Sequence, residues 1–136
     1  MATTYTIDEL LALPDGELNA LAAELRGWYI GGLLGKEEID VWCTGEKSPH
    51  DSYKRQIRVA DWQPATSRDQ SGELLESFVE TQRKGCYAVR SGKLFRSVSI
   101  QAATTGDDVN VSVPGSGAKE QTVAFCAAML AIQETK

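Results

Sequence analysis

Apolar residues recur at helical spacing in three parts of the chain, which predicts three helical segments. The first covers residues 6–25 and is interrupted at Pro14. The second begins near residue 67 and ends at Lys84-Gly85, and the third covers residues 118–134. The third segment has apolar residues around most of its circumference, so we expect it to be the best-buried helix and to lie largely against the sheet.

The starts of these helices have recognisable caps. Thr6 and Glu9 have the spacing of a capping box, in which each side chain accepts a hydrogen bond from the other residue's backbone N–H. Asp15 is the predicted cap of the helix that follows the proline. Ser67, with Gln70 three residues later, predicts another capping box.

Strict alternation of apolar and polar residues predicts five strands. Residues 39–44 and 53–59 alternate on either side of a turn-rich loop and could pair as an antiparallel hairpin. Residues 86–89, 94–101 and 109–113 are separated by short turns, which again favours hairpins. The order of elements therefore predicts an α+β fold, a layered sandwich in which helices pack on a largely antiparallel sheet.

Length and composition fit one globular domain spanning residues 1–136. Hydrophobic residues make up 42% of the chain, and no apolar run approaches the roughly 20 residues of a membrane span. The N-terminus lacks the basic and apolar regions of a signal peptide, so we expect a cytoplasmic protein without membrane contact. The net charge of −5 makes nucleic acid an unlikely partner, because phosphate contacts need clustered cations.

The residues that usually carry catalysis are sparse. Cys43, Cys86 and Cys126 are far apart and form no CxxC pair, so neither a disulfide framework nor a zinc site is expected. His50 is the only histidine. No phosphate loop, dinucleotide-binding motif or nucleophile elbow occurs. We therefore expect a protein without catalytic residues, metal or cofactor.

A stretch that combines cations and aromatic rings suggests a ligand. Trp42 alternates away from its apolar neighbours, so it is either covered by a helix or offers a stacking surface. Lys54, Arg55, Arg58 and Arg68 lead to a helix N-terminus, where backbone N–H groups favour an anion, although a solvated strand face would explain them too. The candidate ligand contacts are Trp42, Arg58, Trp62, Thr66, Ser67 and Arg68.

Three stretches in order resemble the phage ABA sandwich domain and related small bacteriophage and prophage proteins. They are residues 13–28, ending in Gly-Trp; residues 62–78, with a proline, a Thr-Ser pair and Gly-x-Leu-Leu-Glu; and the small-residue helix 124–132. The family tends to place Asp directly after the Ser-Thr pair, where this chain has Arg68. The resemblance implies an antiparallel sheet with helices packed on it. Small phage proteins of this kind are often counter-defence factors.

These observations lead to one main hypothesis and two alternatives. The main hypothesis is a non-enzymatic bacteriophage accessory protein in the cytoplasm of the infected bacterial host, a sponge that binds a nucleotide-derived immune signal. The first alternative is a factor that inhibits a host defence protein through an acidic face. The second is a hydrolase of the signal, for which the sequence offers no acid/base pair. The sequence is also compatible with a homo-oligomer. The acidic face would comprise Glu37, Glu38, Asp40, Asp107 and Asp108.

Overall fold

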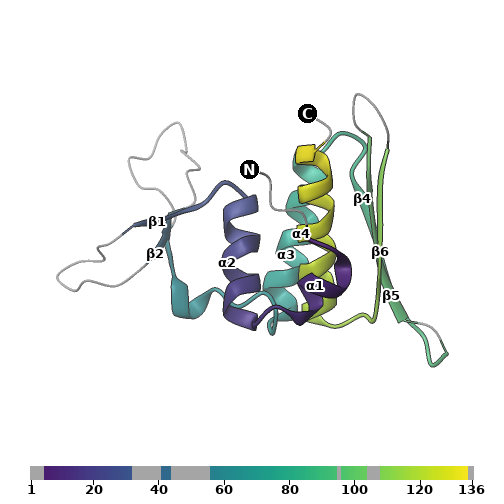
Figure 1. Cartoon of the computed structure of the whole chain (residues 1–136), viewed down its shortest axis with the longest axis horizontal. Helices are drawn as coiled ribbons and strands as arrows, with labels where there is room; N and C mark the ends of the chain where they lie inside the picture. The colour runs from purple at the N-terminus through teal and green to yellow at the C-terminus, as the bar shows by residue number, and fades with distance from the viewer. Residues whose placement is uncertain (1–4, 32–40, 44–55, 95, 104–107, 135–136) are drawn as a thin grey trace.

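The computed structural model describes residues 5–31, 41–43, 56–94, 96–103 and 108–134 of the chain (Figure 1). Helices and strands alternate in groups along the sequence. The elements in chain order are α1 (Ile7–Ala12), α2 (Asp15–Leu25), β1 (Tyr29–Gly31), β2 (Val41–Cys43), β3 (Gln56–Arg58), the 3-10 turn η1 (Val59–Asp61), α3 (Arg68–Thr81), β4 (Cys86–Ser91), β5 (Arg96–Ala102), β6 (Val109–Pro114) and α4 (Ala118–Glu134).

The α+β class predicted from the sequence is confirmed. Within the described ranges, the strands form two three-stranded sheets with orders β1-β2-β3 and β4-β5-β6, and the pairings in both are antiparallel. The expected hairpin between the first two predicted strands is present, with Val41 opposite Arg58. Strand β1 was not predicted from the sequence. Its three residues are too few to establish an alternating pattern.

Helix α4 lies between the layer of helices and the sheet β4-β5-β6 (Figure 1). It contacts α1, α2 and α3 on one side and strands β5 and β6 on the other. Its predicted bounds, 118–134, agree with the structure. Ala124 and Ala128 are fully buried, and such small side chains let neighbouring elements approach the helix closely. Among the described helices, none has both the length and the apolar character needed to cross a bilayer.

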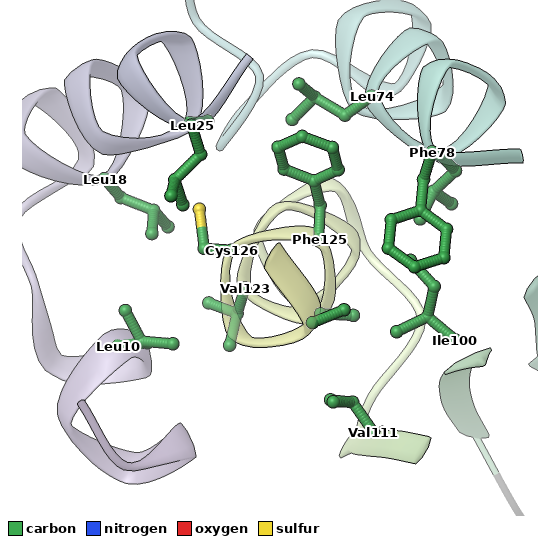
Figure 2. Packing of buried hydrophobic residues seen from close by; sticks show 14 of the residues in the cluster. Leu10, Leu18, Leu25, Leu74, Phe78, Ile100, Val111, Val123, Phe125 and Cys126 are labelled. Carbon is green, nitrogen blue, oxygen red and sulfur yellow. The ribbon is translucent and has the colours of Figure 1, made fainter. Parts of the chain in front are cut away.

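The side chains of α4 divide between both layers, which corrects the expectation that they lie largely against the sheet. Figure 2 shows Phe125 pointing toward Leu74 of α3, and Cys126 pointing toward Leu18 and Leu25 of α2. The reason is that a helix with apolar residues around most of its circumference needs cover on more than one side. Met129 and Leu130 of the same helix are only partly buried.

The ends of α2 follow the rules of helix capping with one correction. Pro14 occupies the N-cap position, and Asp15, predicted as the cap, is the first helical residue. Because proline has no side-chain oxygen, this N-cap makes no side-chain hydrogen bond to the first turn of the helix. At the other end, Gly27 adopts a φ of 86°. The Trp28 N–H then donates to the Ala23 carbonyl over 3.0 Å, which completes a Schellman motif and sets the direction of β1.

The two predicted capping boxes differ in outcome. The box of Thr6 and Glu9 at the start of α1 is present in both directions. At α3, the Ser67 hydroxyl accepts the Gln70 N–H over 3.3 Å, so Ser67 is the cap. The Gln70 side chain does not return to Ser67. It donates to the Asp61 carbonyl over 2.7 Å, so the second box is only half formed.

Helix α3 ends earlier than expected. It stops at Thr81, because Gln82 is already in an extended conformation, whereas the sequence suggested an end at Lys84-Gly85. Gly85 has a different role. A Cβ added at this position would lie 2.9 Å from the Phe78 carbonyl oxygen, so only glycine lets strand β4 start this close to the helix.

The sheet β4-β5-β6 turns one apolar face inward. The predicted alternation of β6 is observed, with Val109, Val111 and Val113 buried between exposed neighbours. In β5, Ile100 is fully buried. The strand was predicted to begin at residue 94, but Leu94 lies before its start at Arg96 and is fully exposed.

A polar contact joins α3 to the sheet, while Val79 of the same helix is 37% exposed. The Tyr87 hydroxyl of β4 donates to the Glu76 carboxylate of α3. This hydrogen bond, with a smaller contribution from desolvation, raises the pKa of Tyr87.

We predict that Phe125→Ala will lower the free energy of unfolding by about 3–5 kcal/mol, the usual cost of removing a fully buried phenylalanine. Phe125 lies near the middle of α4, and its side chain is 1% exposed. Gln133→Ala, at an exposed position of the same helix, should change stability by no more than about 0.5 kcal/mol. Urea denaturation of both variants provides the measurement. Equal stabilities would contradict the central placement of α4.

The two thiols whose side chains are described should differ in reactivity. Burial raises the pKa of the Cys126 thiol, while Cys86 is exposed. Because the thiolate is the nucleophile, iodoacetamide at pH 8 should alkylate Cys86 in the native protein and Cys126 only after unfolding. Peptide mapping by mass spectrometry distinguishes the sites. Alkylation of both at the same rate under native conditions would mean that the α2–α4 contact opens readily.

Candidate functional site

A groove is lined by residues of the N-terminal half of α2, of β2 and of the segment between β3 and α3. Its volume is about 280 Å³. Pockets for complete drug-sized ligands are typically about 300–1,000 Å³, so this groove suits a single ring system rather than a large ligand. Its wall residues are Asp15, Gly16, Asn19, Ala20, Trp42, Val59, Trp62, Gln63 and Thr66.

Two of the predicted stacking residues line this groove, but as part of the core. Trp42 is 2% exposed and Trp62 is 1% exposed, so neither offers an open ring face. The choice left open for Trp42 is thereby decided in favour of a covered ring. Trp62 also packs against Trp28, with ring centroids 4.5 Å apart and planes tilted by 58°. The indoles therefore form a rigid apolar wall of the groove.

A buried asparagine joins α2 to this wall. Asn19 Oδ1 accepts the Ala65 N–H over 2.9 Å, and the Asn19 carbonyl accepts the indole N–H of Trp62, also over 2.9 Å. Asn19 is 8% exposed, so the Ala65 N–H would be left unpaired without it. These two hydrogen bonds fix the distance between the two sides of the groove.

The end of α2 supports the same wall from behind. The Arg26 guanidinium lies 4.3 Å from the centre of the Trp28 ring, a cation–π contact. Its Nη1 is 3.6 Å from Glu73 Oε1 of α3. Since Trp28 packs on Trp62, this series of contacts runs from α3 through α2 to the groove.

Thr66 lines the groove and Ser67 does not, although both were predicted as phosphate contacts. The backbone N–H groups of both residues donate to the Gln63 carbonyl, over 3.1 Å and 2.8 Å. The Ser67 hydroxyl caps α3. These donors are already paired within the turn, so a phosphate would have to compete with the turn for them.

The two predicted arginine contacts are exposed and lie outside the groove wall. Arg58 directly precedes Val59, which lines the groove, and Arg68 follows Thr66 by two residues. Both arginines are close in sequence to residues that line the groove. The structure does not place either side chain in the groove wall. The other basic group, at the β4–β5 hairpin, is also exposed and comprises Arg90, Lys93 and Arg96.

Several residues of the earlier hypotheses lie outside the described residues. This applies to most of the proposed acidic face, of which only Asp108 is described, and it is exposed. It also applies to part of the basic stretch and to the single histidine. The residues concerned are Glu37, Glu38, Asp40, His50, Lys54, Arg55 and Asp107.

The groove contains residues that sequence reasoning missed, chiefly Asp15 and Asn19. Asn19 had a detectable signal, because it follows the apolar position Leu18 and so lies at the border of the buried face of α2. Asp15 was taken as a cap and not as a wall residue. Within the described ranges, no three His, Cys, Asp or Glu side chains are grouped so that they could hold a metal ion.

No protein-family model, curated protein or solved structure matches the chain.

We predict that Asn19→Ala will lower the free energy of unfolding by about 1–3 kcal/mol, the cost of leaving a buried donor unpaired. The donor in question is the Ala65 N–H. Glu17→Ala, at an exposed position of the same helix, should stay within about 0.5 kcal/mol of the unmodified protein. Denaturant titration followed by tryptophan fluorescence measures both. An unchanged midpoint for Asn19→Ala would show that the hydrogen bond does not hold the groove together.

Proposed function

We propose that the protein is a non-enzymatic bacteriophage accessory protein that binds a nucleotide-derived ligand. In this proposal it acts in the cytoplasm of the infected bacterial host and sequesters a signal of bacterial immunity. The resemblance of three ordered stretches to phage ABA sandwich proteins supports the phage context. The groove beside α2 supports the ligand class.

The observation that carries the proposal is the composition of the groove wall. Two indoles, Trp42 and Trp62, provide apolar surface, while Asp15 and Asn19 provide polar groups at one side. A planar, partly polar ring such as a nucleobase matches a narrow apolar groove in which a few polar groups orient the ligand. The buried indoles shape this groove and do not stack on the ring. The volume of about 280 Å³ favours entry of one base, with the sugar and phosphate outside.

Two exposed arginines, close in sequence to groove-lining residues, are candidates to bind the phosphate of such a ligand. Arg58 and Arg68 stand on either side of the groove-lining residues Val59 and Thr66 along the chain. A guanidinium binds phosphate oxygens with two parallel hydrogen bonds. Arg68 is the first residue of α3, a position where a cation is slightly unfavourable for the helix, so its presence there has no evident structural benefit.

Binding without turnover is the simplest chemistry for this groove. Among the described residues that line the groove, Asp15 is the only carboxylate, and none is a histidine, cysteine or serine. Hydrolysis of a phosphate ester needs an activated nucleophile and stabilisation of the transferred charge. Asp15 is half-exposed and its carboxylate is paired with Lys119, and it has no partner carboxylate or histidine in the described part of the wall for acid/base work.

Native mass spectrometry of the full chain, mixed with a panel of mononucleotides and cyclic dinucleotides, tests the proposal. Binding predicts the added mass of an intact ligand. Recovery of a converted ligand would instead identify a hydrolase. No retained nucleotide at all would contradict the proposal and favour the alternative, inhibition of a host protein through an acidic face.

Variants of the two arginines test the phosphate contacts. Arg58→Ala and Arg68→Ala should each weaken binding of the retained nucleotide by about 1.5–3 kcal/mol, the range for a hydrogen bond to a charged group. Arg83→Ala, at an exposed position after the far end of α3, is the matched control and should leave affinity unchanged. Calorimetry provides the affinities. Equal affinity in all three variants would remove Arg58 and Arg68 from the site.

A further inference from the structure

The side-chain amide of Asn19 has a fixed orientation. A backbone N–H can only donate, so the atom that accepts from Ala65 at 2.9 Å must be the amide oxygen. The amide nitrogen is therefore the other end, and it donates to no group in the described ranges of the chain. Since Asn19 lines the groove, its NH₂ is a hydrogen-bond donor held ready for a ligand.

Asp15 supplies acceptors beside this donor. It precedes Asn19 by four residues on α2, so the two side chains lie on the same face of the helix. Both line the groove. One carboxylate oxygen of Asp15 lies 3.4 Å from Lys119 Nζ of α4, and the side chain is 51% exposed. The carboxylate therefore keeps accepting capacity for a ligand.

The other polar side chains that line the groove, Thr66 and Gln63, already form hydrogen bonds within their own turn. The Thr66 hydroxyl lies within hydrogen-bond distance of the Gln63 carbonyl and of Gln63 Oε1. The amide nitrogen of Gln63 donates to the Ala60 carbonyl over 2.8 Å. Asp15 and Asn19 are thus the two side chains that can read the edge of a bound ring: one accepts, the other donates.

From this pair we infer that the groove selects guanine among the nucleobases. Guanine carries the O6 acceptor next to two donors, N1–H and the 2-amino group. The Asn19 NH₂ can donate to O6 while the two oxygens of Asp15 accept both donors. Adenine, with one donor beside one acceptor, uses the carboxylate only once. The inference rests on the proposed function and specifies its ligand.

Calorimetry on the full chain with bases that differ in single groups tests the selection. The probes are GMP, IMP, which lacks the 2-amino group, and AMP, together with cyclic di-GMP and cyclic di-AMP. We expect guanine ligands to bind about tenfold or more tightly than their inosine or adenine counterparts. Adenine ligands that bind as tightly as guanine ligands would overturn the guanine selection and leave the proposed function standing. If none of these probes binds and the wider panel is also negative, both fail.

Two variants locate the selection. Asn19→Asp keeps an acceptor for the Ala65 N–H but removes the donor, and Asp15→Asn removes an acceptor at a half-exposed position. Each should reduce the preference for GMP over AMP by about tenfold. Glu17→Gln, an exposed position of the same helix that does not line the groove, removes the same charge as Asp15→Asn and should leave the preference unchanged.

The two variants should lose different ligand preferences, and this difference distinguishes a role in recognition from a role in folding. Asp15→Asn should also reduce the preference for GMP over IMP, because only the carboxylate contacts the 2-amino group. Asn19→Asp should leave that second preference largely intact. Guanine selection that survives in both variants would place recognition elsewhere and overturn the inference. Thermal unfolding of each variant is recorded alongside, and the half-exposed Asp15 provides the decisive variant should Asn19→Asp fold poorly.

Discussion

The fold depends on the need to cover one helix on nearly all sides. Helix α4 is apolar around most of its circumference, and it has the sheet β4-β5-β6 on one side and three helices on the other (Figure 1). Phe125 and Cys126 are directed to the helical layer, while Ile100 and Val111 of the sheet approach from the other side (Figure 2). Burial of apolar surface is the main favourable term in folding, so the other elements take their positions from this helix.

The groove depends on this arrangement indirectly, through α2. Helix α2 packs on α4, and the border of its buried face carries Asn19, whose two hydrogen bonds hold the Trp62–Ala65 segment in place. Trp62 in turn packs on Trp28 just after the Schellman turn of α2. The wall of the groove is thus part of the core. Such a wall is pre-organised, because a ligand that enters orders few side chains and loses little binding energy to entropy.

The sequence predicted the elements whose evidence is local and missed what depends on tertiary contacts. The caps at Thr6 and Ser67, the bounds of α4 and the alternation of β6 were accessible, because hydrogen-bonding side chains and periodicity act over a few residues. Alternation could place Trp42 on one face of a strand but could not say whether that face is covered. The role of Asn19 was equally hidden, since its partners are 43 and 46 residues away in the chain.

Charge explains why the base, more than the phosphate, would determine what this protein retains. With a net charge of −5, the chain has the same sign of charge as polyphosphates and nucleic acids, which disfavours their association in the proposed function. Arg58 and Arg68 can offset this locally, but as exposed groups they gain only modest and salt-sensitive energy. Asn19 is 8% exposed, so a hydrogen bond from its amide to a ligand would be weakened less by solvent than the contacts of these arginines. An acidic protein of this design would discriminate by the ring it admits and would leave abundant anionic polymers in the cell unbound.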